Sequence, residues 1–379
     1  MRICAEARTL EIACSSRSYP VVIGSGLIED TLAEPIERVW IVDDFFADRF
    51  RPLGLDPIFI HADEPAKSLD RMSDVITALM ERGASRETQL VAVGGGVVQD
   101  VSAFVASIYR RGVEYIYLPT TLLSMVDSCI GGKSSLNVGE YKNIVGTITP
   151  PSAVRIDPAF TATLSREQVA EGLCEAAKIC LAGGADRLKS YLALAPSIDA
   201  DGDVMAAVIS HALNAKAQFI ELDEFDQKER LLLNFGHTFG HAIEAASAFR
   251  ISHGIGVGVG MLAAIELGRG MGRTYADAPH ILVLIEHIES LLGAIDGLDH
   301  ELRTIDSEAF MRAFEFDKKH SQRKLVVIMA TEAGTLERTA LPRDDVHRRL
   351  IANAFRAVVD RNAPERAGWQ QKMVSIYAG

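Results

Sequence analysis

The stretch Leu90-Val91-Ala92-Val93-Gly94-Gly95-Gly96-Val97-Val98-Gln99-Asp100 decides the fold class of the first part of the chain. A short apolar run that enters glycines and then a helical pattern is typical of a buried strand followed by a tight turn. Glycines at such a turn let backbone N–H groups approach a phosphate at the helix N-terminus. Because Gln99 stands at the third glycine position of G-x-G-x-x-G, the motif is not the usual dinucleotide fingerprint. A tight turn without a ligand therefore remains an alternative.

The pattern around this stretch predicts a parallel α/β sheet, because short β-branched runs alternate with helical stretches over residues 1–160. The predicted strands are Pro20–Ile23, Val39–Val42, Ile58–Ile60, Leu90–Val93, Tyr115–Leu118 and Val154–Ile156. The predicted helices between them are Leu27–Leu32, Ser68–Arg82 and Val97–Tyr109.

The pattern changes near residues 157–165, where long amphipathic stretches replace the strands. The predicted helices are Arg166–Leu181, Val204–Asp223, Leu231–Ala248, Val257–Met271 and His280–Leu292, and Leu325–Met329 is one late strand. We therefore predict an α/β domain with a parallel sheet over residues 1–162 and a mostly α-helical domain over residues 163–379.

Composition limits the classes of function. The chain of 379 residues has a net charge of -12, which argues against a general nucleic-acid binder, since such proteins usually present a basic face. It has no apolar run of the roughly 18 residues that a membrane span requires, and its first residues show no apolar signal core. The five cysteines form no C-x-x-C pair. We expect a cytoplasmic protein with free thiols that does not bind a membrane.

Polar residues follow two further predicted strands of the sheet. Asp43 and Asp44 come after the strand Val39–Val42, and Thr120 and Thr121 follow the strand Tyr115–Leu118. Acidic residues at the end of a strand can accept hydrogen bonds from ribose hydroxyls, although they can equally cap the next helix. Together with the glycines, these residues predict a dinucleotide crevice at the carboxyl edge of the sheet.

The segment from Asp127 to Asn137 is dense in glycine, lysine and hydroxyl residues, and Lys142-Asn143 follows it. Its G-G-K-S sequence (residues 131–134) is not a P-loop, because Asp127 stands where the first glycine of G-x-x-x-x-G-K-[ST] is required. Lysines and asparagines on a loop suit an anionic, hydroxylated ligand. A solvated loop without a ligand is the alternative.

The second half carries polar residues inside apolar helices. Glu175 and Lys178 lie three residues apart on one such helix, and Lys216 lies on another. Between Arg230 and His253, four polar residues at i, i+4, i+7 and i+11 predict one polar stripe along a single helix. These four are Arg230, Asn234, His237 and His241. Gly236 and Gly240 would let another backbone approach that helix closely.

Imidazoles and a carboxylate without a cysteine pair suit a zinc site that keeps an open position. Spacing alone favours His237 and His241, one turn apart, as the chelating pair, with His253 and Glu175 as further candidates.

The motifs, taken together, resemble those of the 3-dehydroquinate synthase family of sugar phosphate cyclases over roughly residues 20–330. The matching segments are G-G-G-V-V-x-D (94–100), Y-R-R-G (109–112), L-P-T-T-L-L (118–123), V-D-S-x-x-G-G-K-S (126–134), K-N (142–143), E-x-x-K (175–178), L-N-F-G-H-T-F-G-H-A-I-E (233–244) and H-G (253–254). One departure is Gln99, which stands where the family usually has glycine.

The resemblance implies an NAD-binding domain over residues 1–162 and a metal-binding helical domain over residues 163–379. It places the ligands of a divalent metal, zinc or cobalt, at Glu175, His237 and His253, and it moves His241 to the substrate's phosphate. The NAD-binding positions would be Asp44, Glu64, Lys67, Gly95, Gly96, Asp100, Thr120, Thr121, Lys133, Lys142 and Thr163. The substrate-binding and catalytic positions would be Asp127, Lys133, Lys142, Asn143, Lys178, Lys216, Arg230, Asn234, His241, Lys318 or Lys319, and Arg111 of a partner subunit.

The resemblance also implies a lyase that forms a homodimer and acts on a phosphorylated sugar acid, 3-deoxy-D-arabino-heptulosonate 7-phosphate of the shikimate pathway. NAD would act as an internal redox cofactor during phosphate elimination and ring closure, without net oxidation. The alternatives are another cyclase of secondary metabolism, of the amino-dehydroquinate, 2-deoxy-scyllo-inosose or valiolone type, and a polyol dehydrogenase of the glycerol dehydrogenase type.

Overall fold

A computed structural model describes residues 7–317 and 319–361 of the chain. Contacts between Cα atoms divide these residues into two compact units. The first holds residues 7–179 and 191–230, and the second holds residues 180–190, 231–317 and 319–361. The division follows packing, so the functional boundary between residues 162 and 163 remains a prediction.

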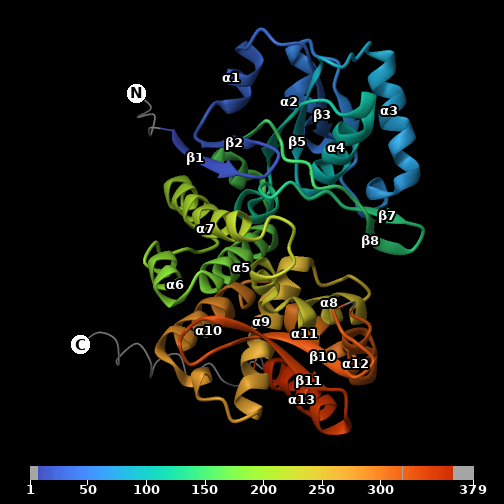
Figure 1. Ribbon diagram of the computed structural model, residues 1–379. Helices are drawn as coiled ribbons and strands as arrows, with labels where there is room; N and C mark the ends of the chain where they lie inside the picture. Colours follow the sequence, from blue (N-terminus) through green and yellow to red (C-terminus); the bar gives the residue numbers. More distant parts are fainter. Residues whose placement is uncertain (1–6, 318, 362–379) are drawn as a thin grey trace. The chain divides into compact units, whose positions relative to one another are not determined.

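The first unit contains a seven-stranded sheet in the order β1-β2-β9-β6-β5-β3-β4. Strands β1, β2, β3 and β5 of this sheet are labelled in Figure 1. All neighbouring pairs are parallel except β1 with β2, so the predicted α/β fold with a parallel sheet is confirmed. The strands are β1 Arg8–Ala13, β2 Ser18–Ile23, β3 Arg38–Asp43, β4 Ile58–Ile60, β5 Gln89–Gly94, β6 Tyr115–Pro119 and β9 Ala153–Ile156. The sequence reading missed β1, the antiparallel edge strand.

Strand β5 explains why the sequence reads as a continuous apolar run. Leu90, Val91, Ala92 and Val93 are each 0% exposed, as expected for a parallel strand covered on both faces. Helix α4 packs on β3, β5 and β6, and α7 packs on β1. The helices of this unit are α1 Leu27–Ala33, α2 Ala47–Phe50, α3 Met72–Glu81, α4 Gly96–Ile108, α7 Gly202–Leu222 and most of α5 Arg166–Ala182.

The segment predicted as a loop around residues 127–143 has more regular structure than expected. The π-helical turn η6, Ser124–Ser128, carries Asp127. Farther along, β7 Leu136–Val138 pairs with β8 Tyr141–Val145 as an antiparallel hairpin. Single π-helical turns are rare and occur frequently at functional sites.

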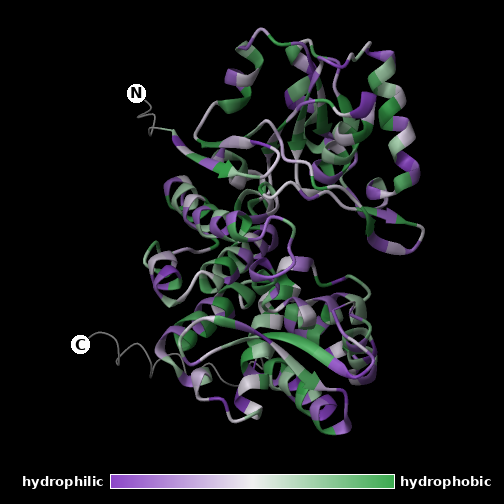
Figure 2. Ribbon diagram, in the orientation of Figure 1, coloured by the Kyte–Doolittle hydropathy of each residue, from purple (hydrophilic) through white to green (hydrophobic). Residues whose placement is uncertain are grey.

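The second unit is mostly helical, which confirms the predicted class of the C-terminal part. Its helices are α8 His237–Ala246, α9 His253–Gly270, α10 Pro279–Leu292, α11 Leu298–Thr304, α12 Ser307–Glu315 and α13 Asp345–Arg361, together with most of α6 Ala185–Leu192. The late strand β10 Lys324–Ala330 was predicted, but its antiparallel partner β11 Leu336–Pro342 was not. Figure 2 shows why β10 is recognisable, since it is hydrophobic along most of its length. No helix of the described residues is long and apolar enough to cross a membrane.

The prediction of one helix over residues 231–248 is wrong. A 3-10 segment, η8 Glu229–Asn234, precedes the helix, and Gly236 has a φ of 80°. This left-handed conformation separates the two segments, and α8 begins at His237. Arg230 and Asn234 therefore do not share a helical stripe with the histidines.

Candidate functional site

Most of the predicted site residues fall into three groups, and the first group lies at the carboxyl edge of the sheet. Strands β6, β5, β3 and β4 are consecutive neighbours, so the residues that follow them gather at one edge. Six of the predicted NAD-binding positions follow these four strands. They are Asp44, Glu64, Gly95, Gly96, Thr120 and Thr121. Gly95 has a steric role, because a Cβ there would lie 2.9 Å from Cγ2 of Thr121.

Lys67 connects the first turn of α4 with the β7–β8 hairpin. Its buried Nζ lies 2.7 Å from Oδ2 of Asp100 and donates to Oδ1 of Asn143 at 3.1 Å. Burial raises the pKa of Asp100, and the charge of Lys67 opposes this effect. Asn143, whose φ is 57°, is held by a hydrogen bond from its N–H to Oδ1 of Asn137.

Glu64 receives a second pair of donors from the hairpin. Nδ2 of Asn137 donates to Oε1 of Glu64 at 2.7 Å, and Nζ of Lys142 lies 3.8 Å from the same oxygen. Thr163 is farther along the chain, at the end of the turn after β9, where its hydroxyl donates to the carbonyl of Phe160. The assignment of these residues to NAD remains a prediction.

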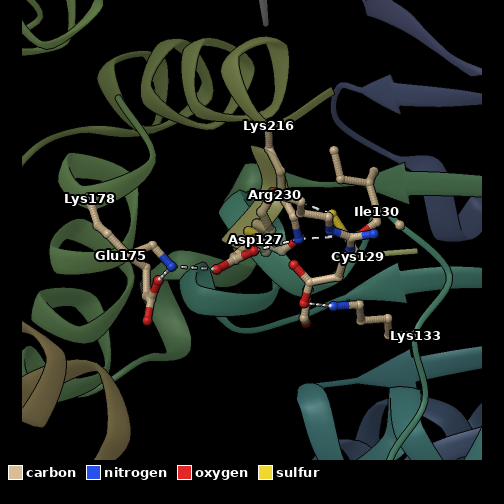
Figure 3. A network of polar contacts seen from close by, with 12 residues as sticks. Asp127, Cys129, Ile130, Lys133, Glu175, Lys178, Lys216 and Arg230 are labelled. Carbon is tan, nitrogen blue, oxygen red and sulfur yellow. Dashed lines mark hydrogen bonds and ion pairs between the residues drawn. The ribbon is translucent and has the colours of Figure 1, made fainter. Parts of the chain in front are cut away.

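The second group is a buried ionic network, drawn in Figure 3, with Asp127 at its centre. Nζ of Lys178 lies 3.2 Å from Oδ2 of Asp127 and also pairs with Glu175, one turn away on α5. Lys216 of α7 pairs with the other carboxylate oxygen of Asp127 and donates to the carbonyl of Ile130 at 3.2 Å. Glu175, Lys178 and Lys216 are at most 4% exposed. Both lysines and the glutamate therefore face inward from their apolar helices.

Asp226 joins this group, although the sequence reading did not single it out. Its Oδ2 accepts a hydrogen bond from Nζ of Lys133 at 2.5 Å, and its φ is 59°. The segment is shaped by Asp223, whose carboxylate accepts from the backbone N–H groups of residues 227, 228 and 230. The run of acidic residues 223, 224 and 226 just before Arg230 was the available signal.

Arg230 differs from the other cations of this group, because no carboxylate in the described part of the chain forms an ion pair with it. The residue is 4% exposed, and its Nη1 donates to the carbonyl of Glu224 at 2.7 Å. Among residues 7–317 and 319–361, no carboxylate lies within ion-pair distance of its guanidinium. The guanidinium fits there because Gly131 lacks a side chain, since a Cβ would lie 2.2 Å from Nη2.

The charges of the network shift each other's pKa values. Burial would raise the pKa of Asp127, but Lys178 and then Lys216 hold it well below its usual value. Burial lowers the pKa of Lys216 and of Lys133, and the positive charge of Arg230 lowers both further. Because Arg230 acts on both lysines, this part of the network carries excess positive charge that suits an anion.

The third group lies in the second unit, where helices α8 and α9 meet at glycines. A Cβ on Gly240 would lie 3.0 Å from the backbone of Gly256, and one on Gly260 would lie 2.1 Å from the carbonyl oxygen of Gly236. The close approach predicted for Gly236 and Gly240 is therefore confirmed. It brings together the first residues of the two helices, His237 and His253, whose ring centroids are 5.2 Å apart.

His253 and His241 contact different carboxylates. Nδ1 of His253 lies 2.9 Å from Oε1 of Glu244, the kind of contact that orients an imidazole and leaves its other nitrogen for a metal. His241 is exposed, and its Nδ1 lies 3.4 Å from Oδ2 of Asp317, which also pairs with Lys319. His241, Glu244 and His253 nevertheless offer ligand atoms within 4.8 Å of one another. The donors present in this unit fit a divalent metal.

Three predicted site residues lie outside these contacts. Asn234 donates through Nδ2 to the carbonyl of Leu231 in its own turn. Arg111 is exposed, with a φ of 69°, at the end of a short segment after α4. Lys318 lies outside the described residues.

The sequence of the chain matches a known protein family. Profiles described as 3-dehydroquinate synthase N-terminal and C-terminal match residues 57–171 and 172–320. A 3-dehydroquinate synthase of Dehalococcoides mccartyi is 34% identical over 344 residues, which cover 86% of this chain and 94% of the relative. A 2-deoxy-scyllo-inosose synthase of Streptoalloteichus tenebrarius is 31% identical over 386 residues, covering 95% and 97%.

A solved structure shares the fold. It is a 2-deoxy-scyllo-inosose synthase complexed with carbaglucose-6-phosphate, NAD+ and Co2+, and it superimposes with a TM-score of 0.78 at 22% identity. The alignment covers 92% of this chain and 100% of that chain. The family resemblance inferred from the motifs is confirmed: the chain belongs to the 3-dehydroquinate synthase family and is a sugar phosphate cyclase.

Proposed function

We propose that the protein is a 3-dehydroquinate synthase, which converts 3-deoxy-D-arabino-heptulosonate 7-phosphate into a carbocycle with loss of phosphate. The observation that carries this proposal is the buried guanidinium of Arg230, which lacks a carboxylate partner among the described residues. A buried guanidinium without an anion is costly and matches a planar carboxylate by two parallel hydrogen bonds. The proposed substrate has such a carboxylate, whereas glucose 6-phosphate and sedoheptulose 7-phosphate do not.

Two cofactors belong to the proposal, because the solved relative holds NAD+ and Co2+. We assign NAD to the carboxyl edge of the sheet and a divalent metal, zinc or cobalt, to His237 and His253 with Glu175 as the third ligand. When bound, NAD supplies a reversible hydride acceptor and the metal polarises a ring hydroxyl.

The residues of the chain then hold the substrate and place its charges. Arg230 and Lys216 bind the carboxylate end, and Lys133 exchanges its ion pair with Asp226 for the incoming ligand. Asp127 stays ionised between Lys178 and Lys216, so it fixes both ammonium groups in place. The phosphate end is assigned to His241, Lys142, Asn143 and a lysine at 318 or 319, and Asn234 contributes an amide.

We propose that the phosphate site is completed by Arg111 of a partner subunit in a homodimer. Support comes from its exposure and from its positive φ of 69° at a strained turn, whereas the side chain of the neighbouring Arg110 donates to the carbonyl of Ala84 at 3.2 Å. Arg111→Ala is expected to lower turnover by about 100-fold while sedimentation still reports a dimer, as for loss of charge-assisted phosphate contacts. Arg110→Ala is the matched control. A wild-type protein that is monomeric and fully active would contradict the assignment.

A substrate panel tests the proposed activity. Phosphate release is measured with NAD and zinc or cobalt from three sugars: the heptulosonate phosphate, glucose 6-phosphate and sedoheptulose 7-phosphate. We expect release from the heptulosonate phosphate alone, without NADH accumulation at 340 nm, because the redox steps cancel within one turnover. Release from glucose 6-phosphate alone would favour the 2-deoxy-scyllo-inosose activity of a relative with 31% identity. Net NADH formation from a polyol would instead indicate a dehydrogenase.

A further inference from the structure

Gln99 occupies an unusual place in the first turn of α4. It is 5% exposed, and its backbone N–H donates to the carbonyl of Gly95 at 3.0 Å, so the helix itself fixes its position. A glutamine is much larger than the glycine usual at this position, and a buried amide requires hydrogen-bond partners. The identity of its partners therefore indicates what the side chain does.

Both partners of the amide belong to Ser128, the last residue of the π-helical turn η6. Nε2 of Gln99 donates to the backbone carbonyl of Ser128 at 2.6 Å, and the Ser128 hydroxyl donates back to Oε1 at 2.6 Å. This reciprocal pair holds the backbone and the side chain of one residue at once. Asp127, the centre of the ionic network, is the preceding residue in the same turn.

The neighbouring residue of α4 holds the other end of the same segment. Oδ1 of Asp100 accepts from the backbone N–H of Ser135 at 3.1 Å. The first turn of α4 thus grips residues 128 and 135, the two ends of the segment that contains Lys133. A glycine at position 99 would leave only the second of these contacts.

We propose that Gln99 is a positioning residue, whose amide clamps Ser128 so that the π-helical turn presents Asp127, and the segment after it presents Lys133, to the substrate. The effect on turnover rests on the proposed function, whereas the clamp itself does not. The clamp acts through main-chain geometry, so its loss lowers kcat and leaves the fold of the sheet intact.

Hydrogen exchange tests the clamp without any substrate. The amides of Cys129, Ile130 and Gly131 are hydrogen-bonded in this segment, so their protection can be followed by mass spectrometry. Gln99→Leu, which keeps the volume and loses both bonds, is expected to raise their exchange about ten-fold, the amount that one or two neutral hydrogen bonds allow. Ser102→Ala is the control, because its buried hydroxyl on the same helix has no hydrogen-bond partner among the described residues. Equal exchange in the two variants would overturn the proposal.

Gln99→Glu separates a hydrogen-bond clamp from simple filling of space. A protonated glutamic acid reproduces both bonds, since its O–H donates to the Ser128 carbonyl and its other oxygen accepts from the hydroxyl. The ionised form cannot donate and repels that carbonyl. The kcat of Gln99→Glu relative to wild type is therefore expected to rise about ten-fold as pH falls through the glutamate's pKa, while Gln99→Leu stays uniformly about ten-fold slow. A ratio that stays at the slow level of Gln99→Leu at every pH would contradict the clamp.

The two proposals fail separately. If wild type turns over none of the sugar phosphates, the proposed function fails, and the exchange rates still decide the role of Gln99. If Gln99→Leu does not fold, Ser128→Ala can be used instead, because it removes the hydrogen bond from the Ser128 hydroxyl to Oε1 of Gln99. It is expected to raise exchange in the same amides by a smaller factor, and unchanged exchange would count against the clamp.

Discussion

His237→Ala and His253→Ala are each expected to lose the bound divalent metal and all measurable turnover, whereas His241→Ala is expected to keep the metal. The reason lies in the partners of the rings. His253 is oriented by Glu244 at 2.9 Å and lies beside His237, while His241 is exposed and contacts Asp317, itself paired with Lys319. Metal content after dialysis, measured by mass spectrometry, and phosphate release together check the prediction.

The control is His300→Ala, because His300 is an exposed histidine on α11 outside all three groups. It should keep both metal and turnover. Equal metal loss in the His237, His241 and His253 variants would instead support a shared chelate that includes His241. Loss in the His241 and His253 variants alone would indicate that the metal sits among His241, Glu244 and His253.

Arg230→Met is expected to lower kcat/KM by at least about 30-fold and to make the folded protein more stable. The guanidinium is 4% exposed and has no carboxylate partner among the described residues, so the unliganded protein bears the cost of a buried charge. Replacing a buried ion pair with apolar side chains of similar volume can stabilise a protein by about 1–4 kcal/mol, and we expect a gain of the same order for this unpaired charge. Losing the charge-assisted pair with a substrate carboxylate costs about 2–5 kcal/mol, or at least about 30-fold in kcat/KM. Thermal unfolding and phosphate release measure the two effects.

Arg17→Met is the matched control for this substitution. Arg17 is partly exposed and pairs with Glu114 at 2.7 Å, and surface pairs of this kind contribute about 0–1 kcal/mol. Its stability should change little and its turnover not at all. An Arg230→Met protein that keeps wild-type turnover, or that is simply less stable, would refute the assigned role.

The fold class was predictable because the strands are buried on both faces. The continuous apolar run of β5 and the glycines after it can be recognised from sequence alone, and the contacts at the sheet edge follow from the parallel order. Edge strand β1 and hairpin strand β11 are partly exposed, so they lack such a run and were missed. Helical periodicity predicts that polar residues share a face only where the helix is continuous. Because Gly236 interrupts the helix, Arg230 and Asn234 do not align with His237 and His241.

The candidate site was predictable in part. The inward positions of Glu175, Lys178 and Lys216 followed from apolar flanks on long helices. Asp226 did not, because its role depends on a left-handed backbone that Asp223 stabilises from three residues away. The link from Gln99 to Ser128 joins residues 29 positions apart, and only the packing of α4 reveals it.

The glycine contact between α8 and α9 has a consequence for how this protein can change over time. The separation of His237 and His253 is set by main-chain atoms touching main-chain atoms, with no side chain between them. Substitutions elsewhere in the hydrophobic interior can therefore accumulate without altering the spacing of these two imidazoles. The spacing of these two proposed metal ligands is thus insulated from changes in the core, whereas the long side chains around Asp127 that we assign to the substrate are free to diverge. Such a division suits a scaffold on which related enzymes act on different sugars.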